Sequence, residues 1–126
     1  MRVLVCGGRN FDDRSAMARV LRRFKPAIPT DDDLAEHVII TGGASGADEL
    51  AAQYAEVFGI RLRVYPADWK THGRAAGPIR NQKMLDEGKP DLVIAFPGGR
   101  GTADMVRRAK AAGIPVELAK ELTNAD

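Results

Sequence analysis

The sequence predicts a Rossmann-like α/β fold, a single domain in which a five-stranded parallel sheet carries helices on both faces. Two observations lead to this expectation. Short apolar runs that are typical of buried strands alternate along the chain with segments of helical periodicity. The chain has 126 residues, which suffice for one hydrophobic core but not for two ordinary domains. We therefore expect residues 1–126 to form one domain.

Five stretches have the composition of strands. Four of them are mainly apolar, and the third alternates between charged and apolar residues. The fourth strand ends abruptly, because Pro97 cannot donate to a sheet ladder and the glycines behind it favour a tight turn. In chain order the predicted strands are Arg2–Cys6, His37–Thr41, Arg61–Tyr65, Leu92–Phe96 and Ile114–Leu118.

The first two predicted helices follow glycine turns and begin at polar residues that can cap them. Asp12 or Asp13 can cap the first helix, which we expect to continue to about Phe24. Ser45 and Asp48 form an S-x-x-D pattern, which is typical of a helix N-terminus. This pattern predicts that Asp48 caps the second helix.

The later helix boundaries are marked by proline, threonine and glycine. Gly59 is placed to end the second helix, and Pro78 suits the first turn of a third helix that runs to Gly88. Thr102 can cap a fourth helix, which Gly113 closes. These positions complete the alternation of strands and helices.

Two longer connections interrupt this alternation. Pro26–Glu36 is polar and contains three aspartates, and we interpret it as a solvated surface loop because nothing nearby completes a metal-binding set. Pro66–Gly77 is expected to be a loop that carries Trp69, His72 and Arg74. Neither stretch indicates a second domain.

Composition limits the classes of function. The net charge is only +2 with scattered basic residues, so the footprint of a duplex DNA binder is weak, although nucleic acid is not excluded. The single cysteine, Cys6, rules out an internal disulfide and fits a reducing cytoplasm; we interpret it as a small core residue. No metal-ligand spacing, signal peptide or membrane-spanning run is apparent, so we expect a cytoplasmic protein without a metal.

The expected strand order, 3-2-1-4-5, brings the turns after strands one and four together at the topological switch point, where ligands bind. In Asp91–Met105 a strand, a glycine turn and a helix N-terminus would gather free N–H groups around one point, which favours an anion such as phosphate. The strict G-x-G-x-x-G fingerprint is absent, which argues against hydride transfer with NAD.

Candidate ligand contacts therefore lie in the glycine turns and at the start of the third helix. Arg80 stands out because an arginine near a helix N-terminus opposes the dipole, and an anionic partner would explain it. The predicted ligand- or phosphate-binding residues are Gly7, Gly8, Arg9, Gly42, Gly43, Ser45, Arg80, Asn81, Gly98, Gly99, Arg100, Gly101 and Thr102.

Four motifs, GGRNFDD, TGGASGAD, GPIRNQKM and FPGGRGTADM, together resemble the SLOG superfamily, particularly its YspA/YpsA-related branch of small Rossmann-like proteins. The resemblance covers nearly the whole chain. In the related LOG-type phosphoribohydrolases, a PGGxGTxxE motif binds phosphate and supplies a glutamate that acts with an upstream arginine. Pro97–Thr102 matches this motif, and the arginine role carries over to Arg80. The glutamate does not, because its position is Met105.

Three acids near the predicted site have two interpretations each. Asp12, Asp48 and Asp104 could cap or begin helices for stability alone, or Asp48 or Asp104 could serve in catalysis. Asp104 lies one residue before the glutamate position, a turn of about 100° on a helix. Trp69 could stack on a purine or pack over the sheet edge. His72 could act as a general acid or lie in solvent.

Three functions stay open. The first is binding or sensing of a nucleotide or NAD-related ligand with no required cofactor. The second is LOG-like cleavage of the N-glycosidic bond of nucleoside monophosphates, with Arg80 as a catalytic residue. The third is single-stranded nucleic-acid binding, which the similarity of TGGASGAD to DprA-type proteins suggests and low aromatic content disfavours. The resemblance to LOG-type proteins further implies a homodimer.

Overall fold

A computed structural model describes residues 1–25 and 37–119, so the expected loop Pro26–Glu36 lies outside the described residues. Its centre is a five-stranded parallel sheet in the order β3-β2-β1-β4-β5, which confirms the predicted fold class and strand order. The strands are β1 (Arg2–Cys6), β2 (Val38–Thr41), β3 (Arg61–Val64), β4 (Leu92–Ala95) and β5 (Val116–Leu118).

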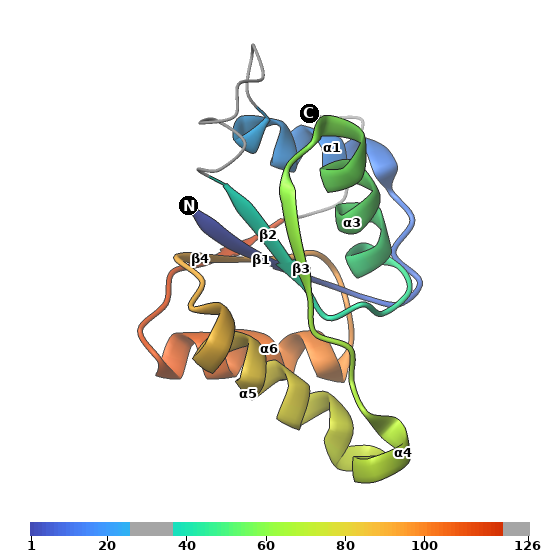
Figure 1. Cartoon of the computed structure of the whole chain (residues 1–126), viewed down its shortest axis with the longest axis vertical. Helices are drawn as coiled ribbons and strands as arrows, with labels where there is room; N and C mark the ends of the chain where they lie inside the picture. Colours follow the sequence, from blue (N-terminus) through green and yellow to red (C-terminus); the bar gives the residue numbers. More distant parts are fainter. Residues whose placement is uncertain (26–36, 120–126) are drawn as a thin grey trace.

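Helices cover both faces of the sheet, as Figure 1 shows: α1 and α3 lie on one face, and α5 and α6 on the other. Short helical turns extend α1 and precede α5. In chain order the helical elements are α1 (Arg14–Leu21), η1 (Arg22–Phe24), α3 (Ala47–Phe58), α4 (Trp69–His72), η2 (Gly73–Ala75), α5 (Ala76–Gly88) and α6 (Arg100–Ala111). None of the helices in the described part of the chain is long and apolar enough to cross a membrane.

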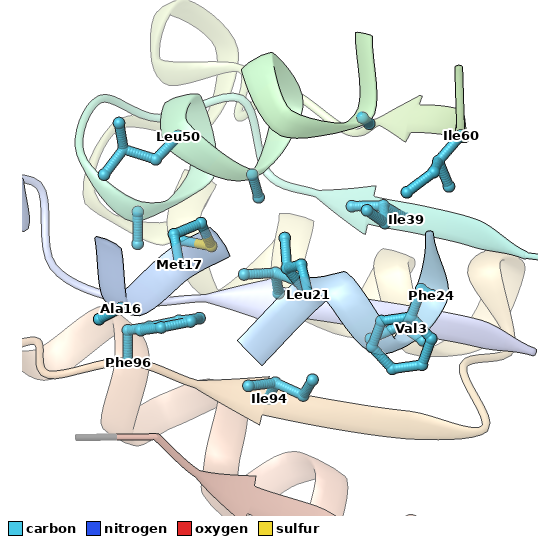
Figure 2. Close-up of a cluster of buried hydrophobic side chains, with 14 of the residues drawn as sticks. Val3, Ala16, Met17, Leu21, Phe24, Ile39, Leu50, Ile60, Ile94 and Phe96 are labelled. Atoms are coloured by element: carbon cyan, nitrogen blue, oxygen red, sulfur yellow. The ribbon is translucent and has the colours of Figure 1, made fainter. Parts of the chain in front are cut away.

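Each face of the sheet has its own hydrophobic core. Under α1 and α3, the predicted apolar residues Met17, Leu21 and Phe24 pack against β1, β2 and β4 (Figure 2). Under α5 and α6, residues from three strands meet the two helices. The buried members of this second core are Leu4, Cys6, Ile40, Met84, Leu85, Val93, Ala95, Met105 and Ala109.

The predicted caps are confirmed in part. Asp13 caps α1, since its carboxylate accepts a hydrogen bond from the Ala16 N–H at 3.0 Å, and Gly59 ends α3 in the left-handed conformation. The cap assigned to Asp48 is wrong: α3 begins after Gly46, without a side-chain cap.

Two further local predictions are wrong. The cap of α6 is Gly99, so Thr102 lies inside the first turn instead of before it. The expected loop Pro66–Gly77 is partly helical, because Asp68 accepts from the Thr71 N–H at 3.1 Å and starts α4. Trp69 and His72 therefore lie on a short helix, and Arg74 lies in the 3-10 turn behind it.

Candidate ligand-binding site

The turns that follow β1, β2 and β4 are joined by backbone hydrogen bonds at the carboxyl edge of the sheet. The Gly8 N–H donates to the Pro97 carbonyl at 2.8 Å, and the Ala47 N–H donates to the Gly8 carbonyl at 3.1 Å. Ser45 adds a bond from its hydroxyl to the Arg9 carbonyl. The topology therefore brings three sequence-distant turns into one rigid edge, as the strand order predicted.

Some of these glycines are required by packing alone. A Cβ on Gly7 would lie 2.6 Å from the Cβ of Ala47, and a Cβ on Gly98 would lie 2.6 Å from the Gly8 nitrogen. Gly46 has a φ of +78° and presses against the backbone of Arg9. These residues let the turns approach each other, which by itself explains why they are glycines.

Gly99 and Gly101 differ from this group. A Cβ built on either residue would meet no atom within 4 Å, and neither has a positive φ. Gly101 stands in the first turn of α6, where glycine destabilises a helix by about 0.5–1 kcal/mol relative to alanine. Protein packing gives no reason for glycine at these two positions, although glycine is favoured over alanine at an N-cap such as Gly99.

A cavity of about 620 Å³ opens beside these glycines. Its walls come from all three turns, from α4 and from the N-terminal halves of α5 and α6. The lining residues are Cys6, Gly7, Gly8, Arg9, Ala44, Asp48, Trp69, Arg74, Gly77, Pro78, Arg80, Asn81, Met84, Gly99, Arg100, Gly101, Thr102 and Asp104. The volume is within the range of small-molecule sites.

At one end of the cavity, Asp48 and Arg80 approach Gly42 from two sides. One carboxylate oxygen of Asp48 accepts from the Gly42 and Ala44 N–H groups, each at 3.2 Å. Arg80 donates from Nη1 to the Gly42 carbonyl at 2.6 Å. A Cβ at position 42 would collide with Nη1 of Arg80, so the guanidinium would have to move to admit any other residue there. Arg80 therefore has a structural partner in addition to any ligand.

Burial dominates the acid–base chemistry at this end. It raises the pKa of the Asp48 carboxyl above its ordinary value, although the Ala44 N–H and the Arg80 charge oppose the shift. It lowers the pKa of Arg80, against the attraction of Asp48. Burial, helped by the negative charge of Asp48, raises the pKa of the Cys6 thiol to about 12, so Cys6 is an unreactive thiol in the cavity wall.

At the other end, Asp104 on α6 lies in a network of donors. Its oxygens accept from Arg107 at 2.5 Å, from Arg108 at 2.9 Å and from the Asn81 amide at 3.0 Å. Burial alone would raise the pKa of Asp104, but the hydrogen bonds of Asn81 and Arg108 and both arginine charges outweigh it, so the pKa lies below its ordinary value.

Asn81 connects the two ends of the cavity. Its amide nitrogen also donates to the Gly101 carbonyl at 3.2 Å, and its amide oxygen accepts from Arg80 Nε at 3.1 Å. Both polar atoms of this side chain are therefore used within the protein. Asn81 fixes the start of α6 against α5, a role that its spacing in the sequence did not indicate.

Met105, at the position of the LOG-type glutamate, does not face the cavity. Its side chain is fully buried in the core under α5 and α6, together with Ala109 one turn later. The cavity is instead lined by Asp104. Asp104, one residue before the glutamate position, thus reaches the cavity, and it is position 105 that the helix turns into the core.

The mouth of the cavity carries the indole ring of Trp69 and three exposed arginines. Trp69 is 49% exposed, and the guanidinium carbon of Arg9 lies 5.4 Å from the centroid of its ring. Arg74 and Arg100 are exposed and line the same cavity. Among the described residues, none of these three arginines forms an ion pair.

Several predicted residues lie away from the cavity wall. Asp12 and His72 are exposed and take no part in it. Gly42, Gly43, Ser45 and Gly98 hold the turns together without lining the cavity. Conversely, sequence reasoning missed Ala44, Gly77, Pro78 and Met84 as lining residues and named Arg74 only as part of a loop. The only hint in the sequence was that Arg74 stands shortly before Pro78, the predicted start of the helix that carries Arg80.

The fold and this cavity define a Rossmann-like protein whose open glycines gather at the switch point of a parallel sheet. The sequence profile of the YspA, cpYpsA-related SLOG family matches residues 1–72 of the 126. The chain belongs to this family, as the motifs indicated. It is also 38% identical to the Gene 61 protein of Mycobacterium phage D29, over 91% of this chain and 93% of that protein.

Two solved structures share the fold at low sequence identity. TM1055, a structural genomics target, superposes with a TM-score of 0.65 at 20% identity, over 91% of this chain and 71% of its own. The UDP-GlcNAc 2-epimerase of Neisseria meningitidis, bound to UDP-GlcNAc, has a TM-score of 0.53 at 18% identity. The match covers 94% of this chain but only 32% of the epimerase chain.

Proposed function

We propose that this protein binds a nucleotide or a nucleotide-derived ligand, with a phosphate group at the N-terminus of α6, and does not cleave it. The observation that carries the proposal is the open space at Gly99 and Gly101. Neither glycine makes room for another protein atom, and together they let an anion approach the free N–H groups of the first turn.

Charge supports the same assignment. Arg9, Arg74 and Arg100 reach the cavity from three different elements, and none forms an ion pair within the described residues. Asp104, one of the two acids in the cavity wall, is already paired with Arg107 and Arg108. The fold is compatible with such a ligand, since the epimerase with the same architecture was solved with a nucleotide sugar.

The expected absence of turnover rests on how Asp104 is held. Asp104 accepts three donors, and a carboxylate so occupied is a weak stabiliser of positive charge on a ribose. A hydrolase remains the second candidate because of Asp48. A carboxyl whose pKa is raised, beside an arginine in a cavity wall, suits a general acid.

Calorimetry with AMP, ADP and NAD tests the proposal on wild type, Gly99→Ala and Gly101→Ala. The added methyl groups meet no protein atom. We expect Gly101→Ala to keep or gain stability and Gly99→Ala to lose up to about 1 kcal/mol, because alanine is a poorer N-cap than glycine, with binding at least about tenfold weaker for Gly99→Ala. Arg80→Ala is a poorer probe, because it also removes a bond to Gly42.

Two results would overturn this function. Unchanged nucleotide affinity in both glycine variants would show that phosphate does not bind at the N-terminus of α6. Chromatographic detection of free base after incubation with a nucleoside monophosphate, lost in Asp48→Asn but not in Asp104→Asn, would establish the hydrolase instead.

A further inference from the structure

A second hollow, of about 550 Å³, lies between α1 and α3. These two helices cover the sheet face opposite to α5 and α6 (Figure 1). Two contacts across the helices bound it. Arg14 donates to the Gln53 side chain at 2.9 Å, and Lys25 Nζ lies 4.2 Å from the centroid of the Phe58 ring. This α1–α3 groove shares no lining residue with the glycine-turn cavity.

The α3 wall of the groove is apolar. Leu50, Tyr54, Val57 and Phe58 follow each other at the spacing of one helix face, about two turns long. Val57 is 74% exposed, the largest value among the exposed apolar side chains of the described residues. Tyr54 and Phe58 are half-buried and Leu50 is buried, so the apolar surface open to solvent lies mainly at the C-terminal end of α3. Apolar surface beside a hollow is of the kind that a partner can cover.

The α1 wall is basic. Arg14, Arg19, Arg22 and Lys25 line the groove, and no acidic residue does. Within the described residues, none of these four cations has an ion pair, whereas Arg23 pairs with Glu117 across the sheet edge. The groove therefore combines uncompensated positive charge on one side with apolar surface on the other.

We propose that the α1–α3 groove docks an acidic, amphipathic helical segment of a partner protein. Such a segment places apolar side chains against Val57 and the floor of the groove and carboxylates against the four cations. A single nucleic-acid strand fits less well, because it needs open ring faces for stacking and Lys25 already covers the Phe58 ring.

Fluorescence anisotropy with labelled synthetic peptides tests the proposal. The probe is a 15-residue helix-forming peptide with leucine at every third or fourth position, about four glutamates beside the leucine face and alanine elsewhere. We expect it to bind at least about tenfold more tightly than a shuffled peptide of the same composition or a version with lysine in place of glutamate.

Matched variants locate the binding surface. Arg22→Glu and Val57→Asp should each weaken the acidic peptide by about fivefold or more, whereas Lys83→Glu and Ile79→Asp on the exposed side of α5 should not change its affinity. Circular dichroism confirms that each variant folds. The proposal is refuted if the groove variants and the α5 variants have equal effects, or if the shuffled peptide binds as tightly as the acidic one. It is also refuted if the acidic peptide does not bind at millimolar concentration. Loss of an oligonucleotide's binding in Arg22→Glu, with no peptide binding, would assign the groove to nucleic acid instead.

Discussion

The two ends of the glycine-turn cavity hold their carboxylates in opposite ways. Asp104, on α6, faces two arginines and an amide, and its pKa lies below the ordinary value. Asp48, on α3, is buried against two backbone N–H groups with Arg80 nearby, and its pKa lies above the ordinary value. Burial dominates the shift at Asp48, whereas at Asp104 the hydrogen bonds and arginine charges outweigh burial, so the two pKa values move in opposite directions.

The largest expected effect comes from adding a carboxylate to α6 one residue after Asp104. Met105→Glu places a charge in the core without the partners of Asp104, so we expect the free energy of unfolding to fall by at least about 3 kcal/mol. Urea denaturation measures it. Ala103→Glu, on the exposed side of the same helix, is the matched control and should change stability by no more than about 0.5 kcal/mol. A Met105→Glu protein as stable as this control would mean that position 105 does not face the core.

Removing the charge of Asp104 is the next largest change. Asp104→Asn should lower the free energy of unfolding by about 1.5–3 kcal/mol at pH 7, because three donors lose an ionised acceptor. The folded pKa is depressed, so this contribution is present above the unfolded pKa of about 4 and is lost as the pH falls through the folded value. Wild type and variant should therefore converge in stability as the pH falls through the folded pKa of Asp104, and an equal gap at all pH values would contradict the charged network.

Asp48→Asn should give a smaller change with the opposite pH dependence. The amide oxygen can still accept from the Gly42 and Ala44 N–H groups, and the desolvated charge is removed, so we expect a difference within about 1 kcal/mol at pH 7. Because the folded pKa is raised, the contribution of Asp48 is present below the unfolded pKa of about 4 and is lost as the pH rises through the folded value. Carboxyl ¹³C NMR should show Asp48 titrating above about 4 and Asp104 below it; the reverse order would break the comparison.

The sequence was sufficient for the fold because its evidence is local. Apolar runs, glycine turns and the connection rules of parallel sheets lead directly to the order β3-β2-β1-β4-β5. The same reasoning located the convergence of the turns, since the carboxyl ends of parallel strands lie at one edge.

The details of the site depended on packing, which the spacing of a motif does not specify. A motif tells which residues of α6 share a face, but the rotation of the helix is set by Met105 and Ala109 entering the core. The pattern also made Asp48 a helix cap, although its carboxylate turns back to the N–H groups of Gly42 and Ala44. Asn81 was expected at the ligand, and its bonds to Arg80 and Asp104 exist only once α5 and α6 are packed side by side.

The smallest expected change in stability is at the mouth of the cavity, where Arg9 lies over Trp69. Arg9→Ala removes an exposed contact with Trp69, so the free energy of unfolding should change by no more than about 1 kcal/mol. The fluorescence of Trp69, the only tryptophan in the chain, should nevertheless shift, because its ring loses a cation above it. Lys83→Ala, on α5, should leave the emission unchanged.

If Arg9 contacts the phosphate of a ligand, nucleotide affinity should fall by about tenfold in Arg9→Ala. Tighter binding in this variant would mean that Arg9 instead occupies the place on Trp69 where the base stacks.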